Sequence, residues 1–153
     1  MDAPDLLATL ARQEQELQFS AFSNDTALAL GLSLVGAAKA KGKAVTVNIT
    51  RNGQVLFHHA MDGASADQAD WIRRKNNVVN RFGRSSFYIG SEHKLRGVDF
   101  DGIVYLDSKD YAAHGGAFPI IIKGVGIVGT ITVSGLPQAE DHALVVDAIR
   151  AMI

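Results

Sequence analysis

An Asn-Gly dipeptide between two β-rich segments is the feature that most constrains the fold of this chain. Asn52 and Gly53 separate residues 43–50 from residues 54–60, and both segments are rich in β-branched and other apolar residues. Asn-Gly is the strongest short signal for a tight hairpin, because both residues tolerate the positive φ angles of its turn. The sequence therefore predicts an antiparallel strand pair here, and the chain lacks a pure alternation of strands and helices.

A second hairpin is predicted near the C-terminus. Residues 118–123 and residues 127–133 are β-rich and flank the turn sequence Gly124-Val125-Gly126. Residues 17–22 suggest a further short strand, and residues 103–106 suit either a strand or a short turn.

Helical spacing and capping residues predict helices at both ends and in the middle of the chain. They run from Asp2 and Pro4 to near Glu16, from Ser23 or Asn24 to Gly42, from near Asp70 to Gly83, and from Pro137 through Ile149. Residues 62–67 are expected to form a polar loop, and residues 85–101 have no clear assignment. Hairpins combined with these helices predict an α/β (α+β) domain with a largely antiparallel sheet.

The composition is that of a single globular domain covering residues 1–153, since 47% of the residues are hydrophobic and 20% are charged. A formal net charge of −1 favours neither nucleic acid nor an anionic membrane as a partner. Residues 120–133 are the longest apolar stretch, and they are too short for a membrane span. The chain has no cysteine and its N-terminus is acidic and amphipathic, so we expect a cytoplasmic protein.

The middle helix carries a mostly apolar stripe. Its members are Trp71, Lys75, Val78 and Phe82, which share one face by helical spacing. Lys75 is the exception in this stripe. It either extends along its aliphatic stem to solvent or supplies a cation to a pocket.

Another face of the same helix carries groups that suit an anion. These are Arg73, Asn77, Asn80 and Arg84. Guanidinium groups and amides can hold a carboxylate or a phosphate. A solvated surface or a subunit contact explains the same face, because basic residues late in a helix also offset its dipole.

His114, Gly115 and Gly116 form a second candidate for part of a site. Two glycines let main-chain N–H groups turn toward a ligand, and the imidazole of His114 is able to act as a ligand, an acid or a hydrogen-bond donor. A plain turn accounts for these residues equally well.

No complete motif for a reaction is present. Residues 124–129 match GxGxxG, but a strand follows them where a dinucleotide site needs a helix. No metal site is expected, because His58 and His59 point to opposite faces of a strand, His93 is expected in a polar loop, and His142 is expected in the first turn of the last helix. No GxSxG elbow and no paired acid and base occur, so no catalytic residue is assigned and enzymatic activity stays open.

Residues 71–86 and residues 114–137 resemble the GlcG/HbpS-like family, the haem-degrading domain family, and in particular its uncharacterised branch of small stand-alone proteins. Lys75 matches a recurring lysine of the middle helix, and Gly115, Gly116, Pro119 and Ile120 match a Gly-Gly-x-x-Pro-Ile stretch. The resemblance extends from residues 27–40 to the closing DHALVVDAI. It implies a profilin-like three-layer α/β/α fold with a five-stranded antiparallel sheet, assembly into homo-oligomers, and a role for Lys75 beyond reaching solvent.

The resemblance also implies that haem is a candidate ligand, since some relatives bind it. Haem needs an apolar slot, an axial donor and cations for its propionates. Our first hypothesis is an oligomeric protein that binds haem or another small anionic metabolite in a cleft between the Trp71 helix and the His114-Gly115-Gly116 turn. The residues expected to bind the ligand are Trp71, Arg73, Lys75, Arg84, His114, Gly115, Gly116 and Pro119. The alternative is a non-catalytic oligomeric adaptor or scaffold, in which the basic helix contacts subunits or partners.

Overall fold

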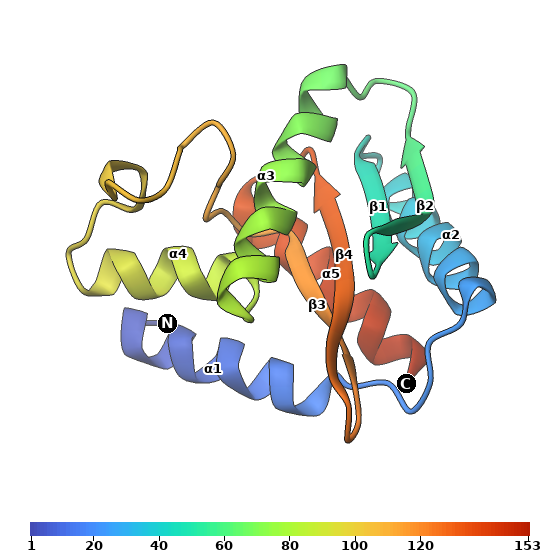
Figure 1. The fold of residues 1–153 in the computed structure, drawn as a ribbon. Coiled ribbons are helices and arrows are strands. Elements are labelled where there is room, and N and C mark those ends of the chain that lie inside the picture. Colours follow the sequence, from blue (N-terminus) through green and yellow to red (C-terminus); the bar gives the residue numbers. More distant parts are fainter.

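The computed structural model describes every residue from Met1 to Ile153. Its centre is an antiparallel sheet with helices on both faces, as Figure 1 shows. The strand order across the sheet is β2-β1-β4-β3. The strands are β1 (Thr46–Arg51), β2 (Gln54–Ala60), β3 (Ala117–Ile122) and β4 (Gly126–Ser134).

Both predicted hairpins are confirmed. Asn52 and Gly53 join β1 to β2 with φ angles of 49° and 82°, the mirror-image geometry that suits the twist of a hairpin. The second hairpin joins β3 to β4, and β4 then pairs with β1, where Val133 lies opposite Val47. This central pairing unites the two hairpins into one sheet.

The expectation of five strands was wrong, because the sheet has four. Residues 17–22 form only an isolated parallel bridge, in which Phe19 lies beside Ile122. The Phe19 N–H donates to the Ile121 carbonyl and the Lys123 N–H donates to the Phe19 carbonyl. The chain then enters a helix capped by Ser23, so pairing stops after this one residue.

The helices are α1 (Ala3–Glu16), α2 (Asn24–Ala40), α3 (Ala66–Phe82), α4 (Ser86–Leu95) and α5 (Gln138–Met152). The predicted helices are confirmed, with α3 starting one turn earlier than expected. Gly83 ends α3 with a φ of 70°, as its position predicted. None of these helices is long and apolar enough to cross a lipid bilayer.

The helix α4 lies where the sequence had no assignment. It packs against α1 and α3, and Figure 1 shows it beside α1. His93 belongs to this helix and not to a polar loop, which corrects the prediction. Its ring is buried, and Nδ1 lies 2.8 Å from the Ile89 carbonyl. Residues 100–102 form a 3₁₀ turn, and residues 103–106 contain no strand.

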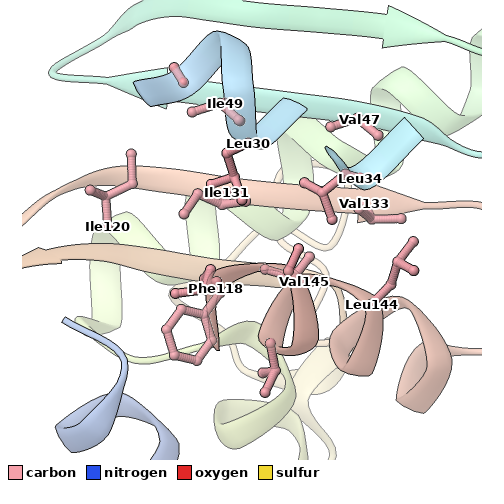
Figure 2. Packing of buried hydrophobic residues seen from close by; sticks show 14 of the residues in the cluster. Leu30, Leu34, Val47, Ile49, Phe118, Ile120, Ile131, Val133, Leu144 and Val145 are labelled. Atoms are coloured by element: carbon pink, nitrogen blue, oxygen red, sulfur yellow. The ribbon is translucent and has the colours of Figure 1, made fainter. Parts of the chain in front are cut away.

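The two faces of the sheet differ in chemistry. One face is apolar and packs on α2 and α5, which together bury most of the core in Figure 2. Its strand residues include Val47, Ile49, Phe118, Ile131 and Val133. At about 25 cal/mol for each Å² of buried apolar surface, this packing is the main source of stability.

The opposite face of the sheet is polar although it is buried under α3. It carries Thr46, Asn48, Thr130, Thr132 and Ser134, which alternate with the core residues along β1 and β4. The side-chain amide of Asn76 on α3 hydrogen-bonds to two of these side chains, at Thr132 Oγ1 and Asn48 Oδ1. Buried polar groups require such hydrogen-bond partners.

Candidate functional site

A polar pocket of about 340 Å³ opens where α3, residue 114 and the connection from β4 to α5 meet. Trp71 and Lys75 come from α3, His114 precedes β3, and Gln138 and Asp141 come from the start of α5. The pocket therefore brings together three predicted site residues, Trp71, Lys75 and His114. Trp71 and Lys75 lie on α3, and His114 lies on the segment before β3.

Lys75 and Asp141 form a buried ion pair at this pocket. The Lys75 Nζ atom lies 3.3 Å from Asp141 Oδ2, and the two side chains are 4% and 2% exposed. Nζ also donates to the Val133 carbonyl at 3.3 Å. Lys75 therefore does not extend to bulk solvent, and its amine lies among the lining groups of the pocket.

The backbone holds Asp141 in place independently of Lys75. Its carboxylate accepts the N–H of Leu136 at 3.0 Å and the N–H of Gly135 at 3.3 Å. Asp141 lies in the first turn of α5, where a carboxylate also suits the helix dipole. The carboxylate is thus fixed in position before any ligand contacts the amine.

Burial changes the acidity of both groups. It lowers the pKa of Lys75, and the charge of Asp141 offsets part of this shift. Burial raises the pKa of Asp141 to about 6, against the opposing effect of Lys75 and the two N–H bonds. The two pKa values move toward each other, so a proton passes between this pair more readily than between an ordinary lysine and aspartate.

Trp71 and His114 both line the pocket, and their rings contact each other. The ring centroids are 5.5 Å apart and nearly perpendicular, the edge-to-face arrangement that aromatic pairs prefer. Trp71 donates its indole N–H to Asp67 at 3.2 Å, which fixes the ring. Partial burial lowers the pKa of His114, so its imidazole is mainly neutral at pH 7 and can both donate and accept a proton.

Gly115 and Gly116, beside His114, allow the backbone to pack closely against neighbouring groups. A Cβ atom on Gly116, whose φ is 139°, would lie 2.4 Å from the Val133 carbonyl oxygen and 2.8 Å from Lys75 Nζ. A Cβ atom on Gly115 would lie 2.3 Å from the Gln138 carbonyl oxygen. The Gly115 N–H donates to the side chain of Gln138 and is not free for a ligand.

Five predicted residues lie outside the pocket lining, namely Gly115 and Gly116 and the three that follow. Pro119 is buried within β3 opposite Thr130. Arg73 is exposed and pairs with Asp70 and Asp110. Arg84 pairs with Glu14. The structure does not bring these side chains together with Lys75, and both arginines already have carboxylate partners.

Asp141 is the main site residue that the sequence reasoning missed. An acidic residue in the first turn of a helix is common because it suits the helix dipole, and 66 positions separate Asp141 from Lys75. No group of three or more potential metal ligands among histidine, cysteine, aspartate and glutamate is placed to hold an ion. The pocket itself offers an amine, a carboxylate, an imidazole and amides, which suit hydrogen bonding and proton transfer.

An apolar groove of about 680 Å³ shares His114 with the polar pocket. Met1 and Leu6 of the N-terminal segment, with Phe87 and Leu95 from α4, form much of its wall. Lys94 also borders it and is exposed. His114 thus stands between a polar cavity and a larger apolar one.

Fold and site together define an α+β domain with an antiparallel sheet between helices and a polar pocket at one end of its middle helix. Residues 22–150 match the family described as "Haem degrading protein HbpS-like", and the chain belongs to this family. A UPF0303 protein of Streptomyces coelicolor is 48% identical over 147 residues, covering 96% of this chain and 93% of that protein. A UPF0303 protein of Edwardsiella ictaluri is 49% identical and covers 100% of this chain and 98% of its own.

Solved structures share this fold. The crystal structure of the Ybr137w protein is 34% identical with a TM-score of 0.87, covering 95% of this chain and 86% of its own. A structure described as a PduOC:Heme complex has a TM-score of 0.73 at 18% identity, covering 86% of this chain and 94% of its own. The crystal structure of HbpS has a TM-score of 0.67 at 20% identity and covers 89% and 92%. The last two likenesses concern the fold alone.

Proposed function

We propose that this protein binds a small polar metabolite in the pocket between α3 and the His114-Gly115-Gly116 turn. The observation that carries this proposal is the meeting of Trp71 and Lys75 of α3 with His114 and with Asp141 of α5 around one cavity of about 340 Å³. Buried charge is costly to maintain, and proteins concentrate shifted pKa values at functional sites. A purely structural role for this face of α3 would be served by apolar side chains.

The charges around the pocket decide which ligands suit it. The positive charge of Lys75 is shared with Asp141, and Asp67 adds a further carboxylate. An anionic ligand must therefore compete with Asp141 for the amine. A ligand with hydroxyl or carbonyl groups needs no such competition, because Gln68 and Gln138 also line the pocket and offer amide donors and acceptors.

Trp71 makes this proposal directly testable, since it is the only tryptophan of the chain. We would titrate the protein with hydroxylated and carboxylated metabolites and record tryptophan fluorescence. The proposal expects saturable changes that Lys75→Met and His114→Ala reduce. Lys123→Met and His59→Ala replace exposed residues outside the pocket and are matched controls. Binding unaffected by the pocket variants would contradict the proposal.

Haem is the second candidate ligand, in the apolar groove rather than in the polar pocket. A haem needs apolar walls and an axial donor, and the groove supplies Leu6, Phe87 and Leu95 with the imidazole of His114. Lys94 would meet a propionate. The family description, and the haem complex of a protein with the same fold, support this candidate. Bound haem would supply redox chemistry that the protein side chains lack.

A haemin titration followed by absorbance separates these two sites. The haem proposal expects a saturable Soret shift that His114→Ala abolishes and Lys94→Ala weakens. Lys75→Met should leave it intact, because Lys75 does not line the groove. A shift that persists in His114→Ala would exclude His114 as the axial donor.

Homo-oligomerisation also belongs to this proposal. Leu28 and Leu32 of α2 are 50% and 58% exposed, and β2 is an edge strand whose Val55 is 56% exposed. Exposed apolar side chains and open edges favour contacts between chains. Light scattering should give the mass of an oligomer that Leu32→Glu reduces. A monomer mass for the unmodified protein would overturn this part of the proposal.

A further inference from the structure

The pocket is suited to a covalent reaction as well as to binding. We propose that the amine of Lys75 forms a reversible imine with a small hydroxylated aldehyde or ketone, with Asp141 as the proton acceptor and donor. This inference rests on the small-ligand pocket proposed above. It assigns to that pocket a substrate class and a covalent bond between the substrate and Lys75.

The surroundings of Nζ support attack on a carbonyl carbon. The amine has only two acceptors in the protein, Asp141 Oδ2 and the Val133 carbonyl, both at 3.3 Å, which is long for bonds to a charged amine. One position on nitrogen is left for a ligand. Gly116 packs closely beside Nζ, and a side chain at this position would displace the amine, since its Cβ atom would approach Nζ to 2.8 Å.

The same groups balance the protons of the reaction. Asp141 takes one proton from the ammonium group, and the free amine adds to the carbonyl carbon. A second proton then moves from the nitrogen to the former carbonyl oxygen, which gives the carbinolamine. Asp141 returns the proton to the hydroxyl group, which leaves as water while the carbon–nitrogen double bond forms. No oxidant, reductant or metal is needed. The backbone N–H groups of Gly135 and Leu136 hold the carboxylate in place throughout.

Desolvation favours this chemistry. Burial lowers the pKa of Lys75, so a larger fraction of its amine is uncharged at pH 7 than for an exposed lysine. His114 also lines the pocket, where its neutral imidazole can hold a ligand hydroxyl. The cavity of about 340 Å³ has room for a short-chain carbonyl compound.

The test uses the whole protein with glycolaldehyde as the probe and cyanoborohydride to trap the imine at pH 7. Peptide mass spectrometry then gives the labelling rate of each lysine in the same sample. We expect Lys75 to be labelled about tenfold faster than the exposed Lys94 and Lys123, because exposed lysines are mostly protonated. Asp141→Asn should slow labelling of Lys75 and leave the other rates unchanged.

Each outcome decides between the proposals. Labelling of Lys75 no faster than that of Lys94 and Lys123 in the unmodified protein overturns the imine, and this comparison needs no variant to fold. If Trp71 fluorescence still reports metabolite binding in that case, the pocket proposal stands alone. If neither labelling nor binding occurs, both proposals fail.

Discussion

His142 allows a quantitative test of how burial controls the stability of this protein. Its side chain is 4% exposed and lies between the rings of Phe87 and Phe118, at centroid distances of 5.1 and 6.1 Å. Nε2 lies 2.7 Å from Gln13 Oε1, while Nδ1 is buried without a partner. Because the Gln13 oxygen can only accept, this contact places an N–H on Nε2, and burial favours the neutral ring.

The magnitude follows from the pKa difference between the folded and unfolded states. Burial lowers the pKa of His142 from 6.5 to about 4. A depressed pKa means that the unfolded state binds the proton more tightly, so this group destabilises the fold as pH falls from 6.5 toward 4. Two-state linkage gives a loss of about 2.5 kcal/mol between pH 7.5 and pH 4.5 from this residue.

His142→Phe removes the titrating group and keeps an aromatic ring between Phe87 and Phe118. We expect the variant to stay within about 1 kcal/mol of the parent at pH 7.5, since it exchanges one hydrogen bond for apolar packing. Urea unfolding at pH 7.5 and pH 4.5 measures the difference. Asp141 acts in the opposite direction, because its raised pKa favours the folded state at low pH, but both proteins contain it.

Equal losses of stability in the parent and in His142→Phe would refute this account. His59→Phe is the matched control, because His59 is an exposed histidine on β2. It should retain the full acid-induced loss of the parent. A loss that disappears in His59→Phe would transfer the effect from the buried imidazole to a surface group.

Three further substitutions test the packing and the ion pairs. Gly129→Ala would place a Cβ atom 2.0 Å from the Thr50 carbonyl oxygen, so thermal unfolding should show a loss of about 1–3 kcal/mol. Glu14→Gln weakens the bond to Arg84, 3.0 Å in the parent, and should cost about 1–3 kcal/mol in urea. Arg73→Ala should change neither the urea midpoint nor metabolite binding, because Arg73 is exposed and outside the pocket.

The parts of the fold that local sequence determines were predicted well. The turn at Asn52 and Gly53 depends on two residues, and the end of α3 depends on Gly83. The prediction of a fifth strand was wrong, because residues 17–22 have β-like composition but pair at Phe19 alone. Pairing across about a hundred residues is decided by the packed structure, not by local preference.

The helix α4 was missed for a different reason. Its sequence SFYIGSEHKL contains Gly90 and lacks a clear apolar stripe, so periodicity gave no signal. Gly90 packs closely on the next segment, since a Cβ atom there would lie 2.0 Å from the Ala113 carbonyl oxygen. Close packing therefore requires glycine at the position where glycine weakens the helical pattern.

The candidate site was only partly predictable, because Lys75 is unusual in its local sequence and Asp141 is not. A lysine within an apolar helical stripe is unusual, so the residues around Lys75 in the sequence indicate that it is a candidate site residue. A carboxylate in the first turn of a helix is common, so the sequence around Asp141 gives no such indication. Only the packing of α3 and α5 around the end of β4 reveals that the two groups are partners, buried together 3.3 Å apart. The lysine of this buried ion pair can therefore be recognised from the sequence, whereas its aspartate partner can be identified only from the folded structure.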